Sequence, residues 1–449
     1  MAELVSIFVG ECGVQMGTDY FKLIAQEHQL NEEGVYVGEQ DYQLENIKCL
    51  YEETQENYIS RSIFCDLDPK TIETLKTNET MTNFRTENCI SGNKTSNGNW
   101  ATGHYTEGAE IVSNVQDSFR NEIERCDNLL GFQIFSSLGG GTGSGLGSLI
   151  TSKVREEYPD KMLYNYTILP ESKNQERNAA SMNYNSVLTY HQLIENSDAV
   201  IMYNNDKLDL ISREKLELET PNLFDYNTII SKHASGITST MRFPGKLNCD
   251  LRKICVNLSP FPRLHFFEPS MSPINWTTFT GDQTFTIEEL LSDLMHKTSF
   301  LLNFEPFKSK QITTQSIFRG INQFDQIENH FSELVKKKSM YISWIKNNYN
   351  CAYSKIPPLD QNFNSVHLWN SANLNQPLLQ AVDVFSNNFE QKKFLTPYLD
   401  QGMCEMEFTE AKSNLVDFIS ELKQYTTAQE IESNSDYSEE YSEEYSEEY

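Results

Sequence analysis

Residues 132–145 read Phe-Gln-Ile-Phe-Ser-Ser-Leu-Gly-Gly-Gly-Thr-Gly-Ser-Gly, and this stretch decides the fold. The apolar run at 132–135 predicts a buried strand, and apolar residues follow the glycines at helical spacing up to Val154, before Pro159. Successive glycines between a strand and a helix expose backbone N–H groups and allow close approach. Because the helix N-terminus adds a partial positive charge, such a loop suits a phosphate group.

The same order of elements occurs at the start of the chain. Residues 4–9 form an apolar run, residues 10–17 form a second glycine loop, and apolar residues then recur at helical spacing from Tyr20 to Ala25. Two strand–loop–helix units predict a parallel α/β sheet. Loops that follow neighbouring parallel strands form the crevice where ligands bind, which favours nucleotide binding. Neither a Walker motif nor GxGxxG occurs, so purely structural glycine turns are the alternative.

The rest of the chain predicts three further parts. A buried strand at 199–203 extends the α/β pattern, and strand candidates such as 263–267 then mix with helix candidates such as 287–295. Apolar residues at alternating spacings of three and four predict an amphipathic helix over 408–425 that lies on the body. The predicted boundaries are 1–205 for the α/β domain, 206–370 for an α+β intermediate domain, 371–430 for a C-terminal helical region and 431–449 for a disordered acidic tail.

Composition excludes several classes of function and location. Acidic residues outnumber basic ones 64 to 36, giving a formal charge of −28, which offers no general attraction for nucleic acid or anionic lipid. No apolar run is long enough to span a bilayer, and the first residues lack the basic start of a signal peptide. The nine cysteines contain no CxxC pair, which argues against a zinc or disulfide framework. We expect a cytoplasmic protein with reduced thiols and no membrane or nucleic-acid partner.

The exact sequence of the second glycine loop resembles a known family signature. Residues 139–145, Gly-Gly-Gly-Thr-Gly-Ser-Gly, resemble the tubulin signature at all seven positions. The similarity extends through residues 100–110, 242–245, 260–267 and 406–411, so recognisable blocks cover most of the chain. The resemblance implies a GTP-binding N-terminal domain, an intermediate domain, C-terminal helices and assembly into microtubules.

One position indicates which tubulins the chain resembles. Lys253 stands where α-tubulins hold a glutamate that activates water, and β-tubulins hold lysine there. The chain is therefore similar to a divergent β-tubulin that pairs with α-tubulin, and it has no catalytic residue of its own. Hydrolysis of its exchangeable GTP would be completed in the polymer by the glutamate of the neighbouring α-tubulin. Asn248, Asp250 and Lys253 would then lie at the longitudinal interface.

The resemblance also implies the binding residues for GTP or GDP and Mg²⁺. Two phosphate loops, a third loop and the groups around the guanine base supply them. The implied nucleotide-binding residues are Gly10, Glu11, Cys12, Gln15, Asn99, Ser137, Gly139, Gly140, Gly141, Thr142, Gly143, Asn205, Leu223 and Asn227. Asp68 and Glu11 are the expected metal ligands, since magnesium takes oxygen ligands while bridging phosphates.

Several positions depart from the family pattern. Glu11 replaces a glutamine beside the phosphates, Asp68 replaces a glutamate, and Leu223 replaces the tyrosine that stacks on guanine. Met182 occupies the place of a ribose-contacting glutamate, and residues 275–283 differ from the usual segment for side-to-side contacts. We expect weakened GTP binding that depends strongly on magnesium, and altered lateral contacts.

Three functions compete at this point. The leading one is a microtubule subunit whose acidic tail binds microtubule-associated proteins and motors. The second is a specialised or assembly-defective β-like tubulin that caps or marks a microtubule subset. The third is a free-standing GTPase, which needs a general base opposite the phosphates, and no candidate stands out in the sequence.

Overall fold

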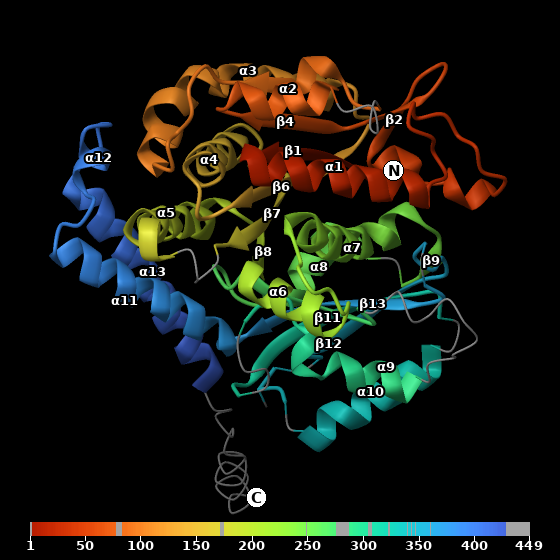
Figure 1. Ribbon diagram of the computed structural model, residues 1–449. Helices are drawn as coiled ribbons and strands as arrows, with labels where there is room; N and C mark the ends of the chain where they lie inside the picture. Colours follow the sequence, from red (N-terminus) through yellow and green to blue (C-terminus); the bar gives the residue numbers. More distant parts are fainter. Residues whose placement is uncertain are drawn as a thin grey trace, which may run out of the picture.

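The computed structural model describes residues 2–77, 83–170, 175–247, 249–274, 287–303, 308–321, 324–338, 340–342, 344–345, 347–359 and 361–427. An eleven-stranded sheet runs through this part of the chain, with helices on both of its faces (Figure 1). Across the described residues, no helix combines the length and apolar character that a bilayer crossing requires.

The sheet has two parts that differ in strand direction. Its order is β5-β4-β1-β6-β7-β8-β10-β13-β11-β12-β9, and the pairs from β5 to β10 are all parallel, whereas β13 pairs antiparallel with both β10 and β11. The strands are β1 (Glu3–Val9), β4 (Ser62–Asp66), β5 (Cys89–Ser91), β6 (Leu129–Ser137), β7 (Met162–Leu169), β8 (Ala199–Asn204), β9 (Gly245–Lys246), β10 (Phe266–Ser272), β11 (Gln311–Arg319), β12 (Tyr349–Ser354) and β13 (Asn364–Ser371), with a separate hairpin of β2 (Tyr51–Glu53) and β3 (Tyr58–Ser60). The predicted parallel sheet is confirmed.

Helices follow most of the parallel strands. They are α1 (Gly10–Glu27), α2 (Pro69–Thr77), α3 (Glu107–Glu124), α4 (Gly147–Glu157), α5 (Gln175–Asn196), α6 (Asn205–Glu214), α7 (Leu223–Arg242), α8 (Leu251–Leu258), α9 (Ile287–Leu294), α10 (Phe324–Lys338), α11 (Asn375–Glu390), α12 (Thr396–Leu399) and α13 (Glu405–Thr427). Single π-helical turns precede α3 and α4.

Alternate residues of β1 show how the sheet is covered. Val5, Ile7 and Val9 pack with α3 and α4, whereas Leu4 and Phe8 pack with α1, α2 and α7 on the other face. Successive strand side chains point to opposite faces, so a strand buried on both faces is a nearly continuous apolar run, which Ser6 alone interrupts between Leu4 and Val9. All five side chains have no exposed surface, and full burial of one such side chain stabilises the fold by about 1.5–3 kcal/mol.

The first glycine segment differs from its prediction. We expected a loop over 10–17, but α1 begins at Gly10, directly after β1. Gly13 and Gly17 serve helix–sheet packing: an added Cβ would lie 2.5 Å from the Phe135 carbonyl oxygen and 2.5 Å from the Phe8 ring, respectively. These glycines let α1 lie close against the sheet, because any side chain there would collide with it.

The strand expected at 263–267 begins later than predicted. β10 begins at Phe266, because Arg263 adopts the left-handed region with φ at 70° and the His265 N–H donates back to the Arg263 carbonyl. β10 then pairs with β8, so one continuous sheet crosses residue 205. The helix expected at 287–295 is confirmed as α9.

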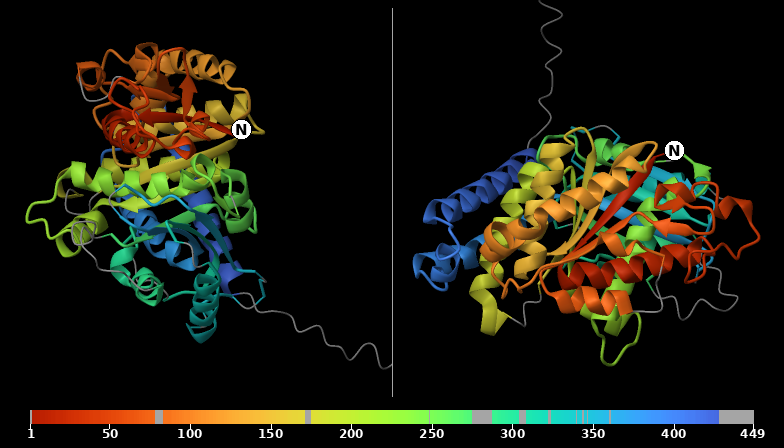
Figure 2. Two further views of the ribbon diagram at one scale, coloured as in Figure 1. Left: turned by 90° about the vertical axis from the view of Figure 1, so that its right-hand side faces the viewer. Right: turned by 90° about the horizontal axis from the view of Figure 1, so that it is seen from above.

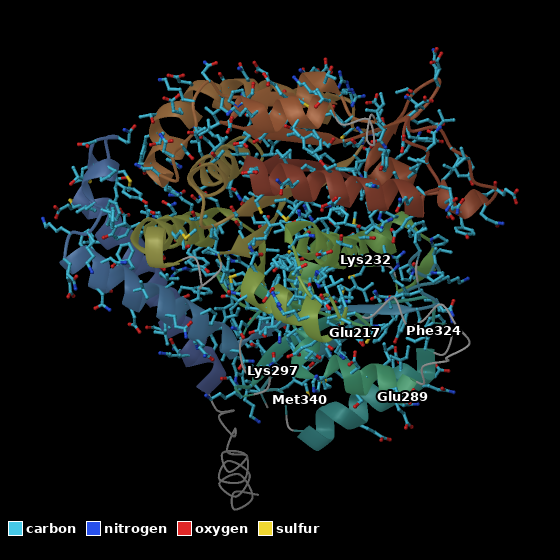
Figure 3. The ribbon with its side chains drawn as sticks, viewed as in Figure 1. Glu217, Lys232, Glu289, Lys297, Phe324 and Met340 are labelled. Carbon is cyan, nitrogen blue, oxygen red and sulfur yellow. The ribbon has the colours of Figure 1, made fainter. Side chains whose placement is uncertain are left out.

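The C-terminal helices lie along one side of the molecule (Figure 2). The predicted amphipathic helix is confirmed as α13, which buries Phe408, Leu415 and Phe418 in a shared core with α5 and α11. Phe324, labelled in Figure 3, is the first residue of α10. The Lys246 ammonium of β9 lies 4.6 Å from the centre of its ring.

A buried ionic cluster joins the two parts of the sheet. Glu27, the last residue of α1, accepts a hydrogen bond from Arg319 of β11 at 2.8 Å and forms an ion pair with Arg242 of α7 at 2.7 Å. These side chains are at most 3% exposed. Burial opposes ionisation of Glu27, but the two arginines outweigh it and lower the pKa of the carboxyl to about 2. The carboxylate therefore stays charged and fixes α1 against α7 and β11.

Replacing Glu27 by alanine should destabilise the protein strongly. The change leaves two buried guanidinium groups without a counter-charge, which costs about 3–5 kcal/mol of unfolding free energy. Lys392→Ala is the control, because its bond to Glu405 joins side chains that are 66% and 48% exposed, and such pairs contribute about 1 kcal/mol or less. Urea unfolding measures both variants, and equal losses would refute a dominant role for the cluster.

Candidate functional site

Three neighbouring strands bring several of the predicted segments to one edge of the sheet. In the order β4-β1-β6, all strands are parallel, so their carboxyl ends lie at one edge of the sheet (Figure 1). The segments that leave this edge are the start of α1, residues 66–68 and the glycine loop after Ser137. Ligands bind at such edges in open α/β sheets.

The backbone of the two glycine segments packs too closely for side chains. Gly10 has φ at 76°, and an added Cβ would lie 3.0 Å from the Gly143 nitrogen. A Cβ on Gly143 would in turn lie 3.0 Å from the Ser137 nitrogen, and one on Gly141 only 2.5 Å from the Asn99 nitrogen. Glycine is therefore required for these segments to approach one another. The sequence analysis had predicted that they contribute to one site.

The remaining residues of the second loop form its turn and the start of the next helix. Gly139 and Gly140 lie in the turn after β6, and the helical segment begins at Thr142. The Thr142 hydroxyl lies 3.1 Å from the Ser96 hydroxyl, which connects this loop to the one that carries Asn99. The loop thus presents backbone N–H groups at a helix start, as a phosphate site needs.

A cavity of about 470 Å³ lies beside these segments, within the range of small-molecule sites. Four of the expected residues line it: Glu11, Gln15, Asp68 and Asn227. The described residues that complete its wall are Val14, Thr18, Asp19, Lys70, Thr71, Thr74, Leu75 and Phe224. The cavity therefore extends from Glu11 along α1 to the first turns of α7, and none of residues 137–143 is among its described lining residues.

The carboxylates of Glu11 and Asp68 face the same cavity. The Gln15 amide donates to Glu11 Oε1 at 3.4 Å, and the Lys70 backbone N–H donates to Asp68 Oδ1 at 3.0 Å. Within the described ranges, no three His, Cys, Asp or Glu side chains group as a metal site. Two carboxylates without further protein ligands fit magnesium, which keeps waters and binds phosphate oxygens.

The thiol next to Glu11 is held neutral. Burial, with the Glu11 charge second, raises the pKa of Cys12 to about 12. A neutral thiol is a weak nucleophile, so burial in the first turn of α1 makes Cys12 poorly reactive.

The far end of the cavity contains a buried amide. Asn227 is 6% exposed, whereas Leu223 is 55% exposed, and neither Leu223 nor Asn205 is among the described lining residues. Phe224 does line the cavity and keeps 60% of its surface exposed. An aromatic ring is therefore available one position after the leucine that replaces the family tyrosine.

Asp19 adds a third carboxyl to the cavity. Burial raises the pKa of Asp19 to about 6, against smaller opposing effects of a hydrogen bond with Asn227 and of the Lys22 charge. The sequence analysis missed Asp19 and Phe224. Asp19 follows Glu11 and Gln15 at helical spacing of four, which was the available signal.

The structure describes two of the three residues expected at the longitudinal interface. Asp250 caps α8 by accepting from the Lys253 backbone N–H at 2.8 Å, and the Lys253 side chain is exposed. Asn248, the segment 275–283 and the tail 431–449 lie outside the described residues. The predictions made for these three stay predictions.

Comparisons with known proteins agree with the architecture. The family model "Tubulin/FtsZ family, GTPase domain" matches residues 3–213, and the model of the tubulin C-terminal domain matches residues 262–380. The chain is 39% identical to the tubulin beta-3 chain of Echinococcus multilocularis and 38% identical to the tubulin beta chain of Candida albicans, each over 98% of both chains. It is 40% identical to the tubulin beta chain of Pneumocystis carinii, over 95% of this chain and 97% of the other. From the parallel sheet, the glycine loops and this similarity along both halves, the chain belongs to the tubulin family, among its β-tubulin-like members.

Proposed function

We propose that the chain is a microtubule subunit that pairs with α-tubulin in the cytoplasm and binds GTP or GDP with Mg²⁺ in the 470 Å³ cavity. The observation that carries the proposal is the meeting of the start of α1 with the loops after β4 and β6 at one edge of the sheet, beside a cavity lined by Glu11, Asp68 and Asn227 of α7. Membership of the tubulin family and the similarity to named β-tubulin chains support it.

Each group has a role in this proposal. Backbone N–H groups of residues 10–12 and 139–143 bind the phosphates, and Glu11 and Asp68 hold Mg²⁺, which neutralises phosphate charge when bound. Asn205 and Asn227 bind the guanine edge, and a site that hydrogen-bonds its ligand rejects analogues lacking those groups.

Hydrolysis in this proposal needs a second subunit. Lys253 is an exposed residue of α8 and cannot supply an acidic group. The glutamate of a neighbouring α-tubulin would complete the site when subunits stack. The proposed interface is formed by Asn248, Asp250 and Lys253, and the tail 431–449 offers a charged segment to basic microtubule-associated proteins and motors.

Co-assembly tests the proposed function. Purified chain with α-tubulin, GTP and Mg²⁺ should form sedimentable polymer that contains both proteins, and GTP turnover should rise with polymer mass. The chain alone should turn over GTP slowly, because the acidic group is absent. Replacing GTP by ATP is the control for base selection. Equal turnover with and without α-tubulin would refute the shared site, and polymer that excludes the chain would refute the subunit role.

Glu11→Gln should reduce the magnesium dependence of GTP binding. The Glu11 carboxylate repels a polyphosphate in the absence of metal and becomes a ligand in its presence. We expect the variant to bind GTP more tightly than wild type in EDTA and to gain less affinity when magnesium is added. Glu390→Gln on α11 makes the same charge change on an exposed surface outside the cavity. Titrations that show equal magnesium dependence in all three proteins would exclude Glu11 as a ligand.

Phe224 and Leu223 differ in their contact with the cavity, which predicts different effects of truncation. Phe224→Ala should weaken GTP binding by about 1–3 kcal/mol, roughly five- to hundred-fold, if its ring stacks on the base. Leu223→Ala should cost much less. Both side chains are more than half exposed, so neither change should unfold the protein. A larger loss for Leu223→Ala would place the base against the leucine instead.

A further inference from the structure

Asn185 lies on α5 outside the residues that the sequence analysis placed in the site. It has no exposed surface. Its Nδ2 donates to the carbonyls of Gly98 at 2.9 Å and Gly139 at 3.0 Å. Its Oδ1 accepts from the Trp100 backbone N–H at 3.0 Å and from the Tyr398 hydroxyl at 2.7 Å. A side-chain amide has two donor hydrogens and one acceptor oxygen with two lone pairs, so every position is used.

The partners of Asn185 come from three separate segments. Gly98 and Trp100 belong to the loop that carries Asn99, Gly139 belongs to the second phosphate loop, and Tyr398 belongs to α12. A further bond joins the same segments, since the Asn99 amide donates to the Pro397 carbonyl at 2.9 Å. One buried amide therefore holds both loops of the proposed nucleotide site to a short C-terminal helix.

The connection continues into the outer helices. The Tyr398 ring packs edge-on against the rings of Tyr184 of α5 and Phe408 of α13, with centroids 5.6 Å apart in each case. The Tyr184 hydroxyl donates to the Lys393 carbonyl in the segment before α12, at 2.9 Å. Packed aromatic rings and satisfied hydrogen bonds resist small shifts, because a displaced buried polar group loses its partner without gaining water.

We propose that Asn185 is a positioning residue that couples the nucleotide site to α12 and, through Tyr398, to α13. The proposal rests on the proposed function, because it takes the loops at Gly98 and Gly139 as those that hold GTP. Nucleotide that orders these loops should also order α12. By linkage, whatever displaces α12 should weaken nucleotide binding by the same factor.

Asn185→Asp, made in the full-length chain, tests the positioning role. The aspartate keeps the shape and the acceptor but removes both donors to Gly98 and Gly139. Asn370→Asp is the matched control: Asn370 is 1% exposed and donates to two backbone carbonyls, those of Leu258 at 2.8 Å and Leu264 at 2.9 Å. We expect similar losses of stability in urea unfolding, but a loss of GTP affinity of at least about fivefold only for Asn185→Asp.

Tyr398→Phe tests the coupling with a milder change that removes only the hydroxyl. In wild type, GTP with Mg²⁺ should slow hydrogen exchange of the backbone amides at 396–400. In Tyr398→Phe this slowing should shrink although GTP still binds. Tyr341→Phe is the control, because it removes a hydroxyl that donates to Thr314 Oγ1 at 2.8 Å in the other part of the sheet.

The outcomes separate the two proposals. If wild-type chain binds no GTP, the proposed function fails and the coupling falls with it. If wild type binds GTP but Asn185→Asp and Asn370→Asp lose affinity equally, the positioning role alone is wrong. The coupling to α12 is wrong if GTP does not change hydrogen exchange at 396–400 in wild type. It is also wrong if GTP slows this exchange equally in Tyr398→Phe and Tyr341→Phe.

Discussion

Parallel pairing of β4, β1 and β6 is the constraint on which the rest of the molecule depends. Parallel strands share one direction, so the segments that follow them are forced together at one edge. At that edge Gly10, Gly141 and Gly143 allow backbones to approach within distances that a side chain would block. The site is therefore mainly a product of backbone packing, and the side chains around it adjust charge and selectivity.

Local patterns were sufficient for the elements that depend on local chemistry. Sequence patterns predicted the apolar strands β1, β6 and β8 and the amphipathic helices α9 and α13. They succeeded because the apolar pattern of a buried face is contained in the segment itself. The packing role of Gly13 could not be predicted from local patterns, because the Phe135 carbonyl that excludes a side chain there is more than a hundred residues away in the sequence. The late start of β10 depends on the left-handed conformation of Arg263, which sequence patterns do not favour for arginine.

The part of the site expected to hold the guanine base shows a limit of assigning residue roles by family position alone. Successive residues at a helix start point in directions about 100° apart, so a neighbour can take over a contact. Leu223 matches the family tyrosine by position, but Phe224 is the residue that lines the cavity. Asn185 was missed for another reason. Its four partners are between 46 and 213 residues away in the sequence, and no local pattern reports such contacts.

The ionic cluster of Glu27 has a consequence for synthesis of the chain. Glu27 and Arg319 are 292 residues apart, so α1 is complete long before its second counter-charge exists. At translation rates of about 5–20 residues per second, roughly 15–60 s separate the two residues on the ribosome. During that interval the apolar face of α1 and the edges of the parallel strands lack their final cover. Apolar surface and strand edges that stay uncovered during synthesis favour aggregation, so the interval before the second half of the sheet arrives is the vulnerable stage of folding.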